Sequence, residues 1–95
     1  MVKMTKVEGK RDVNDKVTLY ALSTCIWCKK TKQLLDDLGI PYEFIYVNEL
    51  SSQDKNEAIQ EMGKYNPGGN FPTLVINDVK VIVGYKKEQI ERELS

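Results

Sequence analysis

Three consecutive segments of the chain have the pattern of a strand, a helix and a second strand. Residues 17–22 are apolar at most positions and rich in β-branched and aromatic side chains, as a buried central strand is. Leucines at helical spacing follow until Gly39 and Pro41, which predicts a helix over about 25–38. Residues 42–47 have the pattern of the next strand. Two strands joined by a helix pair in parallel, so this unit predicts an α/β sheet.

The remainder of the chain predicts two more helices and a hairpin. Ser51 is placed to cap a second helix, which Gly63 weakens. A cluster of Asn, Pro and Gly at 66–70 breaks the chain, and residues 73–83 form two apolar runs around an Asn-Asp turn, as in a hairpin. A short last helix is expected within 85–94.

Residues 1–16 differ in character from the rest of the chain. They are polar and charged, with neither helical periodicity nor a motif, and we expect either an arm or an extra edge strand. Residues 17–95 would then form the folded domain, because a chain of 95 residues has room for one core.

The charge and hydropathy of the chain exclude several classes of partner. Lysine and arginine number 14, and aspartate and glutamate also number 14, so the formal net charge is zero. We find no basic stripe of the kind that binds nucleic acid. The first residues lack the apolar core of a signal peptide, and no apolar run approaches the ~20 residues that span a membrane. We therefore expect a cytoplasmic protein that binds neither nucleic acid nor a membrane.

Both cysteines lie in residues 25–28, Cys-Ile-Trp-Cys, where the first strand gives way to the helix. Residues 23–24, Ser-Thr, are candidates for the helix cap. Side chains three residues apart share a helix face, so the two sulfurs can form and break a disulfide with little rearrangement. Unpaired N–H groups and the positive end of the helix dipole favour a thiolate at this position. We expect Cys25 to be the nucleophile and Cys28 the resolving thiol.

Other uses of a Cys-x-x-Cys pair are less consistent with this sequence. Structural zinc needs two further thiolate or imidazole ligands, and the chain contains no histidine and no third cysteine. A disulfide that closes so short a loop would stabilise a fold very little. Two inert buried thiols are the other alternative, but the edge of an open α/β sheet, where a strand passes into a helix, is where sites are usually built. We predict no metal ligands.

The order of charges along the first predicted helix is a separate indication. Lys29, Lys30 and Lys32 occupy its N-terminal half, while Asp36 and Asp37 lie near its C-terminal end. Both groups oppose the helix dipole, at a cost of about 0.3–1 kcal/mol for each exposed charge. A thiolate at Cys25, or an anionic thiol bound over it, would benefit from these lysines. The alternative is a solvated basic face without a role in the chemistry.

The order of elements over residues 17–94, with the Cys-x-x-Cys helix and Phe71-Pro72-Thr73 before the hairpin, resembles the glutaredoxins and small glutaredoxin-like redoxins. The resemblance implies an α/β thioredoxin fold, in which a four-stranded mixed sheet is flanked by three helices. The strand order would be 42–47, 17–22, 73–76, 79–83. The third strand along the chain would be antiparallel to the first two. A cis peptide bond before Pro72 would aim the Phe71 main chain at a peptide-like substrate.

Several positions depart from the common glutaredoxin pattern. Ile-Trp stands between the cysteines in place of Pro-Tyr, Leu22 replaces a lysine, and Asn70 begins the Asn-Phe-Pro that replaces Thr-Val-Pro. The chain has Gly84-Tyr85-Lys86 where many relatives receive the glutathione carboxylate, and this segment resembles the redoxins that supply electrons to ribonucleotide reductase. Lys86 and the N–H groups of the last helix could hold a carboxylate or sulfonate.

The resemblance predicts a dithiol–disulfide oxidoreductase that reduces protein or small-molecule disulfides and requires no cofactor. The expected thiol-binding residues are Trp27, Lys29, Asn70, Phe71, Pro72, Gly84, Tyr85 and Lys86. The electron donor would be glutathione, another low-molecular-weight thiol or a thioredoxin-reductase-type flavoprotein, and ribonucleotide reductase is one possible target. The alternative is an iron–sulfur scaffold, in which two chains share a cluster through Cys25 and two external thiols. The lack of a proline after Cys25 leaves this alternative open.

Overall fold

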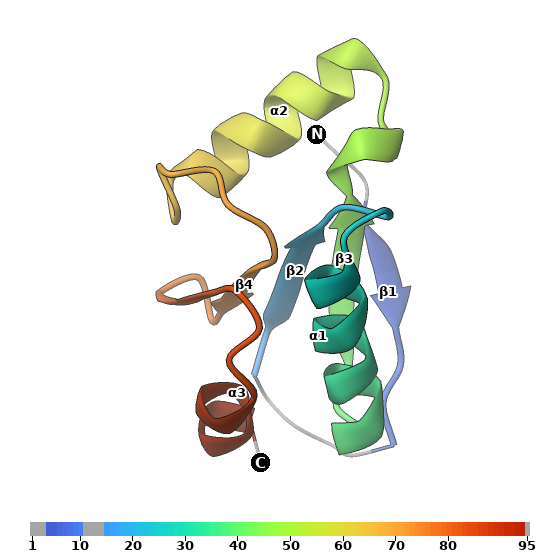
Figure 1. Ribbon diagram of the computed structural model, residues 1–95, viewed down its shortest axis with the longest axis vertical. Helices are drawn as coiled ribbons and strands as arrows, with labels where there is room; N and C mark the ends of the chain where they lie inside the picture. Colours follow the sequence, from blue (N-terminus) through green and yellow to red (C-terminus); the bar gives the residue numbers. More distant parts are fainter. Residues whose placement is uncertain (1–3, 11–14, 95) are drawn as a thin grey trace.

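The computed structural model describes residues 4–10 and 15–94 (Figure 1). Along these residues the elements are β1 (Thr5–Val7), β2 (Val17–Ala21), α1 (Ile26–Leu38), β3 (Tyr42–Tyr46), the 3₁₀ turn η1 (Val47–Glu49), α2 (Ser52–Gly63), β4 (Thr73–Ile76), β5 (Lys80–Val83) and α3 (Lys87–Leu94). The predicted helices and strands are all present, with ends that shift by one or two residues, as expected at frayed termini.

The strands form one mixed sheet in the order β1-β3-β2-β4-β5. The strands β2 and β3 are parallel, whereas β4 is antiparallel to β2 and β5 is antiparallel to β4. This part of the order is the one that the resemblance implies. The sheet has five strands in the described residues where four were predicted, because β1 pairs antiparallel with the outer edge of β3. Its three residues carry little apolar pattern, so backbone pairing to an open edge places this strand.

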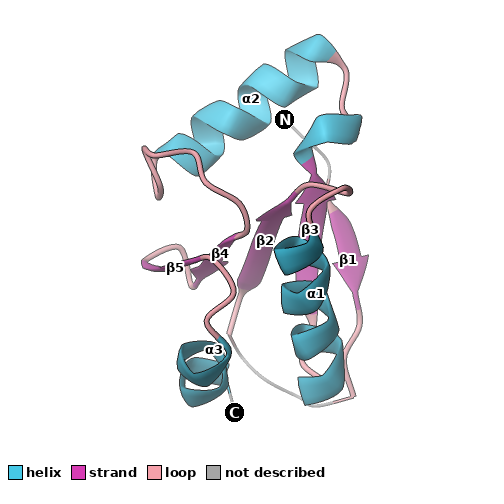
Figure 2. Ribbon diagram, in the orientation of Figure 1, coloured by secondary structure: helices cyan, strands magenta, loops and turns pink. Residues whose placement is uncertain are grey.

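Helices cover both faces of the sheet. One core lies between the sheet and the helices α1 and α3, and includes Leu19, Leu35, Leu74, Ile82 and Ile90. The other lies between the opposite face and α2, and includes Tyr20, Ile45, Ala58, Met62 and Val75. Successive residues of β2, such as Leu19 and Tyr20, point to opposite faces, as the two-residue period of a strand requires. Figure 2 shows α1 running along the sheet and α2 crossing at one end.

The beginning of α1 differs from the prediction. The N-cap is Cys25, whose backbone is extended (φ −91°, ψ 119°) and whose sulfur accepts the Cys28 N–H. Ser23 and Thr24, the predicted caps, therefore lie in the loop before the helix. At the other end, Gly39 adopts the left-handed conformation (φ 70°) and its N–H is bonded to the Asp36 carbonyl, which ends the helix as predicted. The first cysteine is thus a cap rather than the first helical residue.

None of the helices in the described parts of the chain combines the length and the apolar character needed to cross a membrane.

Candidate active site

The sulfur of Cys25 occupies the position of a helix-capping side chain. The Cys28 N–H donates to Cys25 Sγ at 3.2 Å. The Cys25 main chain is held as well, because its N–H donates to the Leu22 carbonyl at 3.2 Å and its carbonyl accepts the Lys29 N–H at 3.1 Å. These three hydrogen bonds fix the position of the Cys25 main chain and of its sulfur at the start of the helix.

The two cysteines, both free thiols, lie in different environments. Cys25 is partly exposed, whereas Cys28 is 1% exposed and belongs to the core beneath α1. Burial first, and the hydrogen bond to Cys25 second, raise the pKa of the Cys28 thiol to about 12. Near neutral pH Cys28 therefore keeps its proton while Cys25 is open to a substrate.

Trp27, which lies between the two cysteines in the sequence, lines a groove. Its volume is about 250 Å³, and it is lined by Trp27, Phe71, Pro72, Gly84 and Tyr85. These residues come from α1, the loop before β4 and the segment after β5, which the sheet brings together. The Phe71–Pro72 peptide bond is cis, which confirms the prediction from the resemblance. The Gly84 N–H donates to the Pro72 carbonyl at 2.8 Å, and Gly84 adopts φ 87°, a conformation that favours glycine.

One wall of the groove is an aromatic stack. The rings of Trp27 and Tyr85 lie 5.9 Å apart with an interplanar angle of 26°. Lys30 adds a cation over the Trp27 ring, with Nζ 4.9 Å from its centroid. Trp27 nevertheless remains 53% exposed. The stack thus offers a flat apolar surface and a positive charge to a molecule that approaches Cys25.

A family model described as Glutaredoxin matches residues 17–81, which is most of the chain. The chain belongs to the glutaredoxin family. A glutaredoxin-like 8.6 kDa protein from the rubredoxin operon of Clostridium pasteurianum is 32% identical over 76 residues, which are 80% of this chain and 93% of that protein. The family and the Cys25–Cys28 pair together give this protein a glutaredoxin-like redox role.

Solved structures agree with this assignment. The crystal structure of methanoredoxin from Methanosarcina acetivorans is 48% identical, with a TM-score of 0.82 over 84% of each chain. The glutaredoxin from Methanosarcina mazei is 44% identical, with a TM-score of 0.85 over 97% of this chain and 87% of that one. Both likenesses extend over most of the chain, so the fold expected from the resemblance is confirmed.

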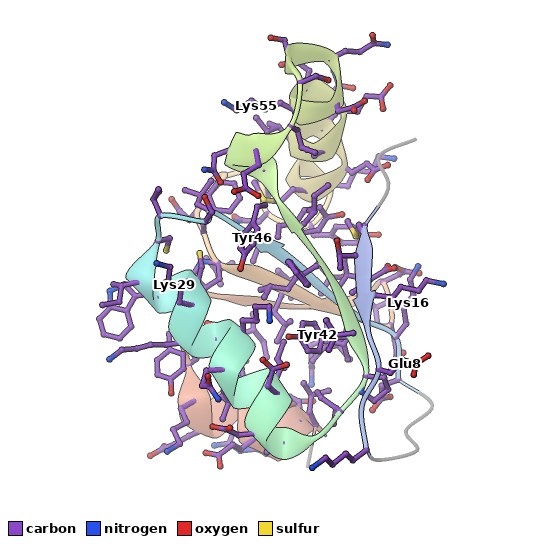
Figure 3. All side chains as sticks on the ribbon, turned by 90° about the vertical axis from the view of Figure 1, so that its right-hand side faces the viewer. Glu8, Lys16, Lys29, Tyr42, Tyr46 and Lys55 are labelled. Carbon is purple, nitrogen blue, oxygen red and sulfur yellow. The ribbon has the colours of Figure 1, made fainter. Side chains whose placement is uncertain are left out.

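The other predicted binding residues of this glutaredoxin are not among the residues that line the groove. Lys29 is exposed in the first turn of α1, which Figure 3 shows beside the end of β3 that carries Tyr46. Lys86 is exposed before α3, and its carbonyl accepts the Ile90 N–H at 2.9 Å. Asn70 is exposed, and its main-chain carbonyl accepts hydrogen bonds from the side chains of Asn66 and Thr73.

Two asparagines that sequence reasoning missed hold the loops around the site. Asn48 in η1 accepts the Ser23 N–H at 2.9 Å and donates to Ser23 Oγ at 2.8 Å, which fixes the loop before Cys25. Asn66 organises the loop before Pro72. The pairing of Asn48 with Ser23 leaves no periodic signal, because it joins polar residues far apart in the chain. The Asn-Pro-Gly-Gly that begins at Asn66 is visible in the sequence, but only as a break between elements.

A larger cleft, of about 440 Å³, lies on the α2 side of the sheet. Tyr20, Glu61 and Tyr65 are among its lining residues, and burial together with Glu61 raises the pKa of Tyr20 to about 12. No cysteine lines it, so it has no part in the thiol chemistry. Among the described residues, no cluster of three or more His, Cys, Asp or Glu side chains could hold a metal ion.

Proposed function

We propose that this glutaredoxin is a dithiol–disulfide oxidoreductase that reduces protein or small-molecule disulfides, with Cys25 as the nucleophile and Cys28 as the resolving thiol. The observation that carries the proposal is the contrast between the two sulfurs. Cys25 Sγ accepts a backbone N–H and is partly exposed, and Cys28 lies buried one helical turn further on with a raised pKa. Cys25 can thus attack a substrate while Cys28 stays protonated.

The cycle consists of two exchange steps. The Cys25 thiolate attacks one sulfur of the substrate disulfide, so that a Cys25–substrate mixed disulfide forms and the other sulfur leaves as a thiolate. Cys28 then loses its proton and attacks Cys25 Sγ, which releases the remaining substrate sulfur as a thiolate. The substrate gains two electrons and two protons, and the protein gains a Cys25–Cys28 disulfide. Two molecules of an external thiol then reduce the Cys25–Cys28 disulfide and are themselves joined by a disulfide.

The second step should depend steeply on pH. Cys28 must lose its proton before it attacks, and burial, the larger cause of its raised pKa, persists when Cys25 is in a mixed disulfide. We expect the rate of release from a preformed Cys25 mixed disulfide to rise about tenfold per pH unit between pH 7 and 9, because this range lies below the raised pKa. Stopped-flow mixing of the purified mixed disulfide with buffers of different pH measures this rate. A plateau that begins near pH 8 would contradict the assignment.

The groove favours an extended, peptide-like substrate. No described residue forms a hydrogen bond with the N–H or carbonyl of Phe71, which lines the groove. These two groups can therefore pair with the main chain of a substrate, as in strand addition. Lys30 supplies positive charge over the Trp27 ring, and Lys29 and Lys86 are exposed and follow residues of the groove closely in the sequence. The chemistry suits a thiol with carboxylate or sulfonate groups, such as glutathione or another low-molecular-weight thiol.

The proposal also includes the compartment, the domain bounds and the partners of the protein. A reducing compartment such as the cytoplasm would keep both cysteines as free thiols. Residues 17–95 would form the redox domain, and residues 1–16 would be an addition whose strand β1 extends the sheet. Disulfide-bearing proteins, among them ribonucleotide reductase, would be the targets, and a flavoprotein reductase is the alternative donor.

Parallel assays of one disulfide with different donors test the proposal. The reduced protein is given bis(2-hydroxyethyl) disulfide, with either glutathione and its reductase, 2-mercaptoethanesulfonate, or thioredoxin reductase and NADPH as the source of electrons. Turnover with at least one donor is expected, and the fastest donor identifies the thiol class. If the reduced protein does not reduce the disulfide even in a single turnover, the proposed function is wrong.

The iron–sulfur alternative is supported by one observation. Each chain presents one partly exposed sulfur, on Cys25, because Cys28 is buried. Two chains and two external thiols would supply the four sulfurs of a cluster. Anaerobic purification decides between the two functions. A brown dimer with visible absorption that loses disulfide reduction would favour the scaffold, whereas a colourless, active monomer would favour the oxidoreductase.

A further inference from the structure

The loop between α2 and β4 is organised by one buried amide side chain. Asn66, which is 9% exposed, uses Nδ2 to donate to the Asn70 carbonyl at 3.3 Å and to Thr73 Oγ1 at 3.0 Å. Its Oδ1 accepts the Gly68 N–H at 3.2 Å. Two points of the loop and the first residue of β4 are thus bonded to a single side chain.

Asn66 and Thr73 also anchor this network to the rigid elements on either side. The Asn66 N–H donates to the Met62 carbonyl of α2 at 2.8 Å. Thr73 is fully buried at the start of β4, and its hydroxyl donates to the Asn70 carbonyl at 2.5 Å while it accepts from Asn66. The Asn70 carbonyl therefore receives two donors, and the loop cannot shift without breaking buried hydrogen bonds.

Phe71 lies between two fixed carbonyls. The Asn70 carbonyl before it is held by Asn66 and Thr73, and the Pro72 carbonyl after it is held by the Gly84 N–H at 2.8 Å. The N–H and carbonyl of Phe71 have no partner of their own in the described chain. Their direction is therefore set by the hydrogen bonds of the neighbouring residues.

We propose that Asn66 is a positioning residue for substrate recognition, which holds the main chain of Phe71 in the orientation that pairs with a peptide disulfide. This inference rests on the proposed function and names the residue that selects its peptide-like substrates. Asn66 lies outside the residues that line the groove, so it acts through the loop and not by contact with the substrate.

The test compares two disulfides in single turnovers of the reduced protein. One is a synthetic peptide with an intramolecular disulfide, and the other is bis(2-hydroxyethyl) disulfide, which has no amide groups. For Asn66→Ala, we expect the half-saturating concentration of the peptide to rise about tenfold, since one or two hydrogen bonds of binding are lost. The maximal rate with the peptide and the rate with the small disulfide should stay within about twofold, since Cys25 is held by other residues.

Two further variants make the result specific. Thr73→Val removes the shared hydroxyl and should raise the half-saturating concentration in the same direction, so it replaces Asn66→Ala if that variant does not fold. Asn56→Ala, an exposed asparagine of α2, is the matched control and should change nothing. The proposal would be overturned if the half-saturating concentration of the peptide did not change. It would also be overturned if the rates with both disulfides fell equally, because a structural defect affects both substrates alike.

A measurement on the reduced proteins separates this inference from the proposed function. Hydrogen exchange of the Gly68 amide, which Asn66 accepts, should accelerate about tenfold in Asn66→Ala if the side chain holds the loop. Unchanged exchange would overturn the inference even when the wild-type protein is active. A wild-type protein that reduces neither disulfide while exchange responds as expected would instead remove the proposed function.

Discussion

Cys25→Ser is expected to lower the rate of disulfide reduction by about 10³-fold or more, because a serine hydroxyl is not a thiolate and cannot form the mixed disulfide. The loss should be the same for a peptide disulfide and for a small disulfide, since both pass through Cys25. The measurement is the single-turnover rate of the reduced variant with each substrate, together with mass spectrometry for an adduct. We expect no adduct at Cys28, which is 1% exposed.

The substitution is well suited to separate chemistry from folding. Cys25 is the N-cap of α1, and serine is among the preferred residues at that position. A serine hydroxyl can accept the Cys28 N–H in place of the sulfur. The free energy of unfolding of Cys25→Ser should therefore match that of the wild type within about 1 kcal/mol, as judged by urea denaturation. Full activity of this folded variant would assign the nucleophile to another group.

Cys28→Ser should stop the cycle after its first step. With no second thiol, the Cys25 mixed disulfide cannot resolve inside the protein, so the release of a reduced protein substrate in a single turnover without external thiol should be slower by about 10²-fold or more. The intact mass of the variant should increase by the mass of the substrate part that stays attached to Cys25. The first step should keep its rate, because Cys25 and its N–H donor are unchanged.

The control for Cys28→Ser concerns its burial. A serine hydroxyl in the core beneath α1 costs about 1–3 kcal/mol if it finds no partner, so Cys28→Ala is made in parallel. Both variants should trap the mixed disulfide to the same extent, whatever their stabilities. If either of them releases substrate at the wild-type rate without an added thiol, then Cys28 is not the resolving group.

The proposed roles of the two cysteines agree with the position at which the helix begins. With Cys25 as the cap, its side chain lies across the first turn and accepts the Cys28 N–H, while Cys28 points into the core. The burial that raises the pKa of Cys28 therefore belongs to the same arrangement that leaves Cys25 accessible.

Much of the fold could be predicted because its signals are local. The apolar pattern of 17–22, the leucines of α1 and the cap at Ser51 are each confined to one element, and each is present in the structure. The cis bond at Pro72 came from the likeness to a family, since nothing in the local sequence distinguishes it from a trans bond. The strand β1 had no such signal, because its pairing depends on an edge of β3 that exists only in the folded sheet.

The sequence by itself determined the chemistry, namely two thiols one helical turn apart at the end of a buried strand, because spacing within one element is set by backbone geometry. Only the tertiary structure decided which groups meet those thiols. Trp27 stacks on Tyr85, and Asn66 reaches Asn70 and Thr73, after the sheet has closed. Such contacts join segments whose separate sequences contain no shared pattern, so they become visible only when packing has fixed the distances between elements.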